Sequence, residues 1–465
     1  MEAVGKGLIR PDVYDKVLGK AVYPDDIELE GMLYAGVKRS TIPYGRVKSI
    51  NLEEIKNMPG VEMVIDHTMI PGAVSHGVIF KDIPTLVSDL IKRVGDAIIL
   101  VVAKDKASLK NALNKVQIQY EELEGIFNMK DALKVGAPIL GDGTNILYDF
   151  KIIRGNVEEG FKEAKYVVEG LYNTPMVEHA FLQPEACVAQ LNEDGVMEVY
   201  IATQYPHYDR EEVARCLGFE EDKVKINNMA IGGAFGARED MNPQCHAAIA
   251  AYLTKRPVKI LYSREESTVS HSKRHPMEIY MKTGVRIDGT LCAMEARIYG
   301  DTGAYASWGM NVLRKAAVHA TGPYRIDNVD IRSMAIYTNN PFAGAMRGFG
   351  ATQIPIATET QMDQLAEKLG IHPLKFRYMN AFKVGDVTAT GQELKSSVGV
   401  RQCLEKLSEI DKISLQYGAI EDETVQYEAI NESSDAEGNT KIDLELMVDE
   451  IEPKKTIDAA VKGGI

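Results

Sequence analysis

The sequence predicts an α+β protein in which a small N-terminal α/β domain is followed by a larger domain that carries two glycine loops. Strand-like and helix-like runs alternate over residues 1–125. In residues 148–410 the order of strand, glycine loop and helix occurs twice. The charged and turn-rich residues 126–147 indicate a linker between the two domains. Residues 411–465 are expected to form an acidic C-terminal extension.

Hydrophobic runs that change between the period of a strand and that of a helix predict the N-terminal domain. We expect a scaffolding role for it. Its predicted strands are Val17–Tyr23, Leu33–Arg39, Arg46–Ile50, Val61–Ile65 and Ala97–Ala103, and its predicted helices are Leu52–Met58 and Lys106–Lys115.

The first glycine loop, residues 232–240, reads GGAFGARED. It follows an alternating run, Lys223–Ile231, and precedes a helical run, Pro243–Lys255. Asp240 or Asn242 can cap this helix. Such a loop can direct N–H groups and the positive end of a helix at an anion or an oxo group.

Gly232, Gly233 and Gly236 would let the backbone approach such a ligand closely. A tight turn also needs glycine, so the loop by itself leaves both interpretations open. The G-x-G-x-x-G spacing fails and no G-x-x-x-x-G-K-[ST] occurs, which excludes the dinucleotide fingerprint and the P-loop.

The second glycine loop, residues 339–353, reads NNPFAGAMRGFGATQ. It follows the strand-like run Ile331–Thr338 and precedes the helical run Ile356–Leu369. Each loop holds one phenylalanine between glycines, Phe235 and Phe349. The repetition favours one ligand site at which two aromatic rings lie beside backbone donors.

Composition excludes several classes of protein. The chain has 465 residues, 45% hydrophobic and 26% charged, so it can build two or three domains with cores of their own. A net charge of −14 argues against nucleic acid or an anionic membrane as the main partner. No apolar run approaches the roughly 20 residues of a membrane span, and the N-terminus has no apolar signal core, so we expect a cytoplasmic protein. The five cysteines include no C-x-x-C pair, and buried free thiols are expected for all five.

The pair GGAFGARED and AMRGFGATQ resembles the two molybdopterin-contacting loops in the large subunit of the molybdenum hydroxylases, the family of xanthine dehydrogenase and aldehyde oxidase. The stretches GKAVYPDD, EHAFLQPE, ATQYP, SREES and GDTGAY match family motifs in the same order. The resemblance runs from about Asp15 to Leu407. It implies that residues 1–125 form an α/β hammerhead domain and residues 148–410 the first molybdopterin-binding domain.

The resemblance also implies roles for single residues. Gln204 would lie beside the oxo group on molybdenum, and the metal would be held through the pterin and by no protein side chain. His179, beside apolar residues, is expected to be a core histidine, and Gln183 stands where the family more often has Glu. The implied cofactor-binding residues are Gln204, Gly233, Ala234, Phe235, Gly236, Arg347, Gly348 and Phe349.

Four residues bear on the substrate. Glu239 stands where xanthine dehydrogenases carry a glutamate that hydrogen-bonds a purine, although a carboxylate at a helix N-terminus is the alternative explanation. Lys315 or its neighbour Arg314 aligns near an arginine that steadies a substrate oxygen, and Phe349 matches a ring that packs on the heterocycle. A purine such as xanthine or hypoxanthine is therefore the first candidate, and nicotinate or a related heterocycle is the second.

The family inserts oxygen from water into an electron-poor C–H bond, and its base carboxylate lies in a second molybdenum-binding half. No stretch after Val400 matches that context, so we expect one half of a split subunit, as in nicotinate dehydrogenases. The partners would be a second molybdopterin-binding chain carrying the base Glu, an iron–sulfur chain with 2Fe-2S clusters, and an FAD chain. The expected cofactor is molybdopterin dinucleotide, in the cytosine form, with a sulfido or selenido ligand left open.

The tail departs from the family pattern. Residues 421–452 hold 12 acidic residues against one basic residue, typical of a solvated tail. Within it, Lys441–Val448 alternates like an edge strand that could dock on a partner. A function of another class also stays open, in which the chain is a non-catalytic pterin carrier.

Overall fold

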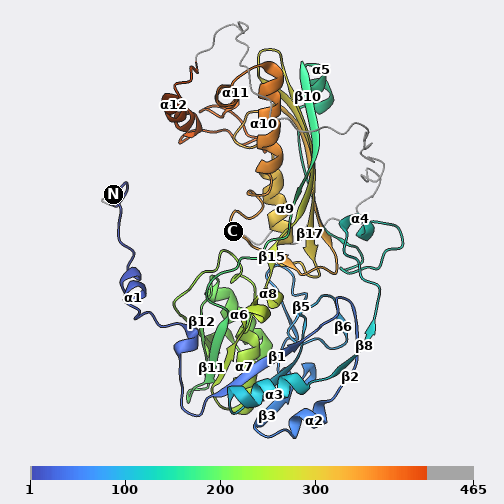
Figure 1. The fold of residues 1–465 in the computed structure, drawn as a ribbon, viewed down its shortest axis with the longest axis vertical. Coiled ribbons are helices and arrows are strands. Elements are labelled where there is room, and N and C mark those ends of the chain that lie inside the picture. Colours follow the sequence, from blue (N-terminus) through green and yellow to red (C-terminus); the bar gives the residue numbers. More distant parts are fainter. Residues whose placement is uncertain (1–2, 416–465) are drawn as a thin grey trace, which may run out of the picture. The chain divides into compact units, whose positions relative to one another are not determined.

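The computed structural model describes residues 3–415, which are organised around two large β-sheets (Figure 1). The acidic run from Glu421 and the strand-like segment Lys441–Val448 lie outside the described residues. Helices and strands both contribute widely, so the predicted α+β class is confirmed.

The first sheet has seven strands and joins the N-terminal part to the larger part. Strand β7 (Ala97–Ala103, AIILVVA) is buried at every residue, as its apolar sequence requires for a strand covered on both faces. It pairs antiparallel with β1 (Leu33–Arg39) and with β3 (Val61–Ile65). On its other side β1 pairs in parallel with β14 (Val258–Leu261). Beyond β14 the order continues through β11 (Ala186–Leu191), β12 (Met197–Ile201) and β13 (Val224–Asn228).

Three helices cover this sheet. α3 (Lys106–Lys115) packs on β1 and β7, α6 (Pro206–Leu217) packs on β13, and α7 (Gln244–Thr254) packs on β11 and β14. The alanine-rich α7 is buried from Gln244 to Ala251, so it lies inside the core with β11 and β12. The first glycine loop therefore connects an edge strand to a buried helix.

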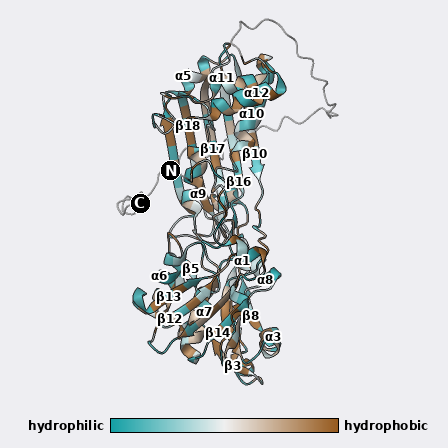
Figure 2. Cartoon of the chain, turned by 90° about the vertical axis from the view of Figure 1, so that its left-hand side faces the viewer, coloured by the Kyte–Doolittle hydropathy of each residue, from teal (hydrophilic) through white to brown (hydrophobic). Residues whose placement is uncertain are grey.

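The second sheet has five strands in the order β10-β16-β17-β18-β9, all from the larger part. β17 and β18 pair in parallel, and the other pairs are antiparallel. α9 (Gly309–Val318) packs on β18 and β9, and α10 (Pro355–Leu369) packs on β10 and β16; both helices run alongside these strands in Figure 1. Figure 2 shows hydrophobic stretches along these strands. The strands are β9 (Ile146–Arg154), β10 (Tyr166–Thr174), β16 (Met277–Val285), β17 (Leu291–Gly303) and β18 (Asn328–Tyr337).

Short strands and further α-helices connect these parts. The short strands are β2 (Gly45–Ile50), β4 (Ser75–His76), β5 (Ile83–Pro84), β6 (Leu90–Ile91), β8 (Ile118–Glu122), β15 (Lys273–Arg274) and β19 (Ala343–Gly344). The other α-helices are α1 (Val13–Val17), α2 (Leu52–Lys56), α4 (Met129–Ala132), α5 (Val157–Lys162), α8 (Arg264–Ser270), α11 (Pro373–Asn380) and α12 (Val400–Asp411).

The predicted strand Ile331–Thr338 is Asn328–Tyr337 in the structure, and two other predicted strands differ in ways that bear on the site. No strand forms at Val17–Tyr23, because α1 ends at Val17 and Gly19 turns the chain at φ 67°. The predicted strand Lys223–Ile231 is Val224–Asn228 in the structure. It ends at Asn228 because β12, its one neighbour in the described part of the chain, ends at the partner residue Ile201. The three residues freed in this way lead into the first glycine loop.

The expected linker is held by hydrogen bonds of its own. Asn145 is buried, accepts from Leu140 N at 2.7 Å and donates to Ala132 O at 2.9 Å. Ile126 N donates to Asn339 Oδ1 at 2.8 Å, at the start of the second glycine loop. Residues 126–147 thus pack against the larger part of the chain.

Candidate functional site

The two glycine loops, far apart in the sequence, meet in the structure. Arg347 N donates to Phe235 O at 2.9 Å. A Cβ added at Gly236 would lie 2.4 Å from Ala345 O, so the two backbones are in direct contact there. Phe235 and Phe349 both have left-handed backbones, with φ 54° and φ 55°. Each such residue costs about 1–2 kcal/mol, so the surrounding packing must hold the loops in place.

Gln204 follows β12 and is fixed to the first loop. Its backbone N donates to Arg238 O at 3.2 Å, and its side-chain Oε1 accepts from Gly236 N at 2.9 Å. Because a backbone N–H can only donate, the amide oxygen must face Gly236 and the NH2 group must lie on the other side. Gln204 is exposed, so this NH2 group is available to a ligand.

The glycines of the first loop leave room for neighbouring segments of the chain. A Cβ at Gly232 would lie 2.7 Å from Gln183 Cβ, and one at Gly233 would lie 2.8 Å from Phe181 Cβ. Together with Gly236, these positions face neighbouring protein. They allow close packing of chain segments, and the expectation that this backbone also approaches a ligand stays a prediction.

Neither Asp240 nor Asn242 caps the helix after the first loop. The N-cap of α7 is Pro243, which makes no side-chain cap, and no acidic residue lies in the first turn. Asp240 instead accepts from Ser307 Oγ at 2.7 Å, just before α9. The predicted cap is therefore wrong, because Asp240 is used to tie the first loop to the segment before α9.

The segment Glu178–Glu185 lies against both loops. His179 Nε2 donates to Ala345 O at 2.8 Å, in the second loop. Gln183 Oε1 accepts from Gly232 N at 2.7 Å, and Arg238 Nη2 donates to Gln183 O at 2.6 Å, in the first. Burial lowers the pKa of His179 to about 4, so its ring is neutral at pH 7.

A buried charge cluster supports this segment. His271 lies between two carboxylates, with Nε2 2.7 Å from Glu178 Oε1 and Nδ1 3.0 Å from Glu185 Oε1, and Lys273 Nζ is 2.7 Å from Glu178. Burial would lower the pKa of His271, but the two carboxylates raise it. Burial would raise the pKa of Glu178, but His271 and Lys273 bring it down to about 2.

Glu178, His179 and His271 place ligand atoms within 4.8 Å of one another, the one such group of metal-ligating side chains among residues 3–415. Lys273 already places an ammonium group 2.7 Å from Glu178, and His179 Nε2 is bound to a carbonyl. Glu178 is already paired with the cationic side chain of Lys273, so these residues form an ion-paired cluster and not a metal site. Sequence reasoning missed His271 and Lys273, which carry no motif of their own.

A second part of the site lies along α9. Trp308, Asn311, Arg314, Lys315, Val318 and Phe349 line a cavity of ≈ 300 Å³. Lys315 Nζ lies 5.9 Å from the centre of the Phe349 ring, and the Trp308 ring meets Phe349 edge-on at 5.6 Å. Three of the residues expected from the sequence, Arg314, Lys315 and Phe349, are thus brought together. Trp308 was missed, because one tryptophan gives no pattern.

Glu239 is not among the residues that line this cavity. Its neighbour Asp240 accepts a hydrogen bond from Ser307, the residue before Trp308. Within residues 3–415 the half-buried Glu239 side chain has no hydrogen-bond or ion-pair partner. Burial and the adjacent charge of Asp240 raise the pKa of Glu239 to about 7. Because it lies before the N-cap of α7, it is not the helix-start carboxylate that was the alternative explanation.

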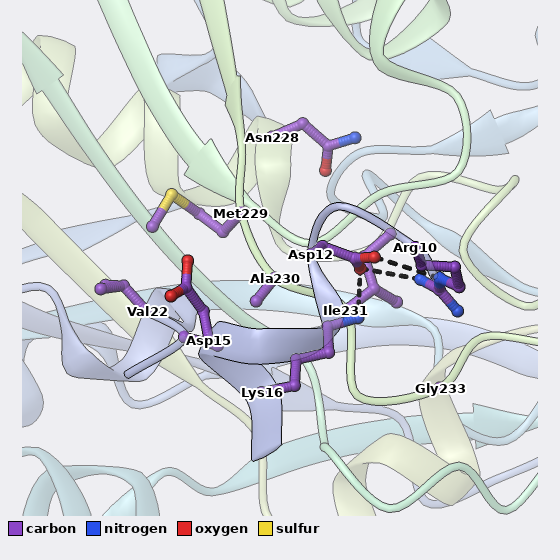
Figure 3. A pocket seen from close by; sticks show the side chains of 11 residues that line it. Arg10, Asp12, Asp15, Lys16, Val22, Asn228, Met229, Ala230, Ile231 and Gly233 are labelled. Carbon is purple, nitrogen blue, oxygen red and sulfur yellow. Dashed lines mark hydrogen bonds and ion pairs between the residues drawn. The ribbon is translucent and has the colours of Figure 1, made fainter. Parts of the chain in front are cut away.

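Another cavity lies beside the first loop. It has a volume of ≈ 720 Å³ and is lined by residues of the α1 region and by Asn228–Ile231 and Gly233. Arg10 and Lys16 both pair with Asp12, at 2.7 and 3.0 Å (Figure 3). Asp12 and Asp15, which both line the cavity, balance these two positive charges, and of the expected site residues only Gly233 lies here.

The expected cofactor residues differ in exposure, and the difference suits an anionic, planar ligand. Within the described chain, the Arg347 guanidinium has no hydrogen-bond or ion-pair partner. With the Gln204 NH2 group and the Phe235 ring, which is 47% exposed, it offers two donors and an aromatic face at one surface. The other expected residues are partly buried (Gly233, Gly348, Phe349) or buried (Ala234, Gly236). The exposed set fits a pterin with phosphate groups.

Comparison with known proteins identifies the class. Residues 140–381 match the molybdopterin cofactor-binding domain, and residues 18–124 match the a/b hammerhead domain of aldehyde oxidase and xanthine dehydrogenase. The chain belongs to this family of molybdenum-dependent oxidoreductases, as a molybdopterin-binding subunit of a molybdenum hydroxylase.

Particular relatives narrow the class. The nicotinate dehydrogenase large molybdopterin subunit of Eubacterium barkeri is 44% identical over 408 residues, which cover 88% of this chain and 96% of that protein. A probable xanthine dehydrogenase subunit of Bacillus subtilis is 38% identical, over 86% of this chain and 54% of that protein. Among solved structures, the aldehyde oxidoreductase of Desulfovibrio gigas superposes with a TM-score of 0.82 at 29% identity, over 87% of this chain and 46% of that one.

The chain therefore spans nearly all of one relative and about half the length of the others. In the part of the chain that the structure describes, no helix has the length and apolar character that a membrane crossing requires.

Proposed function

We propose that this chain takes part in hydroxylating an electron-poor N-heterocycle with oxygen from water, and that a purine such as xanthine or hypoxanthine is the first candidate. The observation that carries the purine is Glu239, a half-buried carboxyl group with no partner in the described chain and a pKa raised to about 7. At neutral pH such a group can donate to or accept from a ring nitrogen.

The chain's own residues would bind and orient the reactants. When bound, the molybdenum cofactor supplies a metal centre that activates water and accepts electrons. Gln204 would donate its amide N–H to an oxygen on that centre, and Phe235 and Arg347 would contact the pterin. Lys315 or Arg314 would stabilise negative charge that develops on the heterocycle, which lowers the barrier only if the contact strengthens in the transition state.

Nicotinate is the second candidate, and two observations favour it. The cavity on α9 has two cationic residues, Arg314 and Lys315, beside the aromatic rings of Phe349 and Trp308, which suits an aromatic carboxylate. The relative that is 44% identical is a nicotinate dehydrogenase subunit. Glu239 would then lack a role in binding the substrate.

We further propose that the working enzyme contains other chains. A second molybdopterin-binding chain would supply the base Glu, and iron–sulfur and FAD chains would carry the electrons away. The cofactor would be the cytosine dinucleotide, in a cytoplasmic complex. The match over 96% of a subunit named as the large one of nicotinate dehydrogenase supports a split arrangement.

The test compares hypoxanthine, xanthine, nicotinate and an aromatic aldehyde as substrates of the complete complex in a dye-linked assay. Glu239→Ala is expected to lower kcat/KM for the purine at least roughly tenfold, equivalent to about 1.4 kcal/mol, with molybdenum content unchanged. A wild-type complex that hydroxylates nicotinate and ignores purines would assign the second candidate.

A further inference from the structure

The histidine that sequence reasoning left in the core is connected to the candidate site. His179 is buried, and its Nε2 lies 2.8 Å from Ala345 O. A carbonyl can only accept, so the proton of the neutral ring is on Nε2 and His179 is the donor. The contact joins segments 166 residues apart and fixes the position of one carbonyl group in the second glycine loop.

That carbonyl abuts the first glycine loop. A Cβ at Gly236 would lie 2.4 Å from Ala345 O and 2.8 Å from Ala345 C, so no side chain fits between the two loops here. Next to this contact, Arg347 N donates to Phe235 O at 2.9 Å. Because the two backbones are in contact, a shift of Ala345 would shift Gly236 as well.

Gly236 in turn orients Gln204. Gly236 N donates to Gln204 Oε1 at 2.9 Å, and the amide is planar, so fixing the oxygen fixes the direction of the NH2 group. We propose that His179 is a positioning residue that sets, through Ala345 and Gly236, the direction in which Gln204 presents its amide NH2 group to the cofactor. This inference rests on the proposed function, because the role of Gln204 toward the cofactor belongs to it.

His179 is itself firmly supported. Its neighbour Glu178 is bound by Lys273 and His271. The ring of His179 lies 5.7 Å from the ring of His271. Lys273 and the next residue form β15, which pairs with β19 directly before Ala345. Donor and acceptor are therefore held by the same small group of segments, as is usual for residues that orient a ligand-binding side chain.

The test uses amide variants that keep a polar side chain. In His179→Gln the amide nitrogen can reach the place of Nε2, whereas in His179→Asn it can reach only that of Nδ1. The matched control is His246, a buried histidine whose Nε2 donates to Thr85 O at 2.7 Å, outside both loops. His246→Gln and His246→Asn repeat the same chemistry there.

Hydrogen exchange of the peptide around Gly236 is measured first, in the full-length chain. We expect His179→Asn to speed exchange of the Gly236 amide roughly fivefold, the effect of losing one hydrogen bond, and His179→Gln to restore it. The His246 variants are expected to leave it unchanged. Gln204→Leu, at an exposed position, is expected to speed the same amide, and the double variant His179→Asn/Gln204→Leu no further.

The second readout is the molybdenum(V) electron paramagnetic resonance spectrum of the native complex. We expect an altered spectrum for His179→Asn, with molybdenum content kept, and the wild-type spectrum for His179→Gln. Wild-type exchange in His179→Asn, or additive effects in the double variant, would overturn the inference. A wild-type complex without molybdenum would instead overturn the proposed function, and the exchange result would still decide the positioning role.

Discussion

Gly236→Ala tests whether the two glycine loops hold the cofactor through their mutual contact. The added Cβ would lie 2.4 Å from Ala345 O, and the backbone at Gly236 has φ 110°. The left-handed conformation costs an L-residue on the order of 1–3 kcal/mol. Forcing a methyl group into a packed contact costs about another 1–3 kcal/mol. We expect a local cost of about 2–6 kcal/mol, because the two effects add at one position.

Gly385→Ala separates the two effects. Gly385 has φ 92° but nothing within 4 Å of its Cβ direction, so only the backbone cost applies there. The difference in free-energy cost between the two variants then measures the contact between the loops, about 1–3 kcal/mol. This corresponds to a roughly 5- to 150-fold change in the population of separated loops.

The assay is molybdenum per chain in the purified complex, together with hydrogen exchange of both loops and denaturant unfolding of the whole chain. We expect Gly236→Ala to lose most of its molybdenum and to expose both loops, while Gly385→Ala keeps its molybdenum and destabilises only its own region. Equal molybdenum content and equal loop exchange in the two variants would refute the reasoning.

Two further predictions concern pH. The pKa of Glu239 is raised to about 7 from 4.5, so the stability that its neutral form contributes is lost as pH rises through about 7. At pH 8 the free energy of unfolding of Glu239→Gln is expected to exceed that of the wild type by about 1–2 kcal/mol, after discounting for partial exposure, and below pH ~4.5 the two free energies are expected to be equal. Identical urea unfolding curves at pH 8 would contradict this. The pKa of Glu178 is lowered to about 2 from 4.5, so its contribution is present above pH 4.5 and lost as pH falls through 2. Between pH 4.5 and 2 the wild type should lose about 1–2 kcal/mol more free energy of unfolding than Glu178→Gln. If the stability of both proteins fell in parallel with pH, the ion pairs of Glu178 with His271 and Lys273 would contribute nothing to stability.

Much of the fold could be predicted from periodicity. The bounds of β1, β3, β7 and α3 agree with prediction, because their apolar pattern is strong and turns flank them. The N-terminal strand at Val17–Tyr23 could not be excluded from the sequence, since a short alternating run becomes a strand only if a neighbour pairs with it. The parallel pairing of β1 with β14 also could not be predicted from the local sequence pattern, because the two strands are far apart in the chain.

For the candidate site, the sequence indicated residues of the two loops and Gln204 better than the residues that support them. Gln204, Phe235 and Arg347 stand in motifs and lie at one exposed surface. His271 contacts Glu178 and Glu185, and Arg238 donates to Gln183 O. These partners are far away in the chain, so spacing could not reveal them. The missing side chains of the first-loop glycines make room for Gln183, Phe181 and Ala345, contacts that local pattern could not indicate. That these glycines also approach a ligand stays a prediction.

The most direct test of the account is the content of the native complex, purified through a tag on this chain. We predict molybdenum and a pterin in equal amounts, cytidine nucleotide released on acid hydrolysis, and a second molybdopterin-binding chain in the same complex. Substitution of Gln204 by Ala should leave the chains assembled but lower the molybdenum content. A soluble, fully assembled complex with neither molybdenum nor pterin fluorescence would contradict the account.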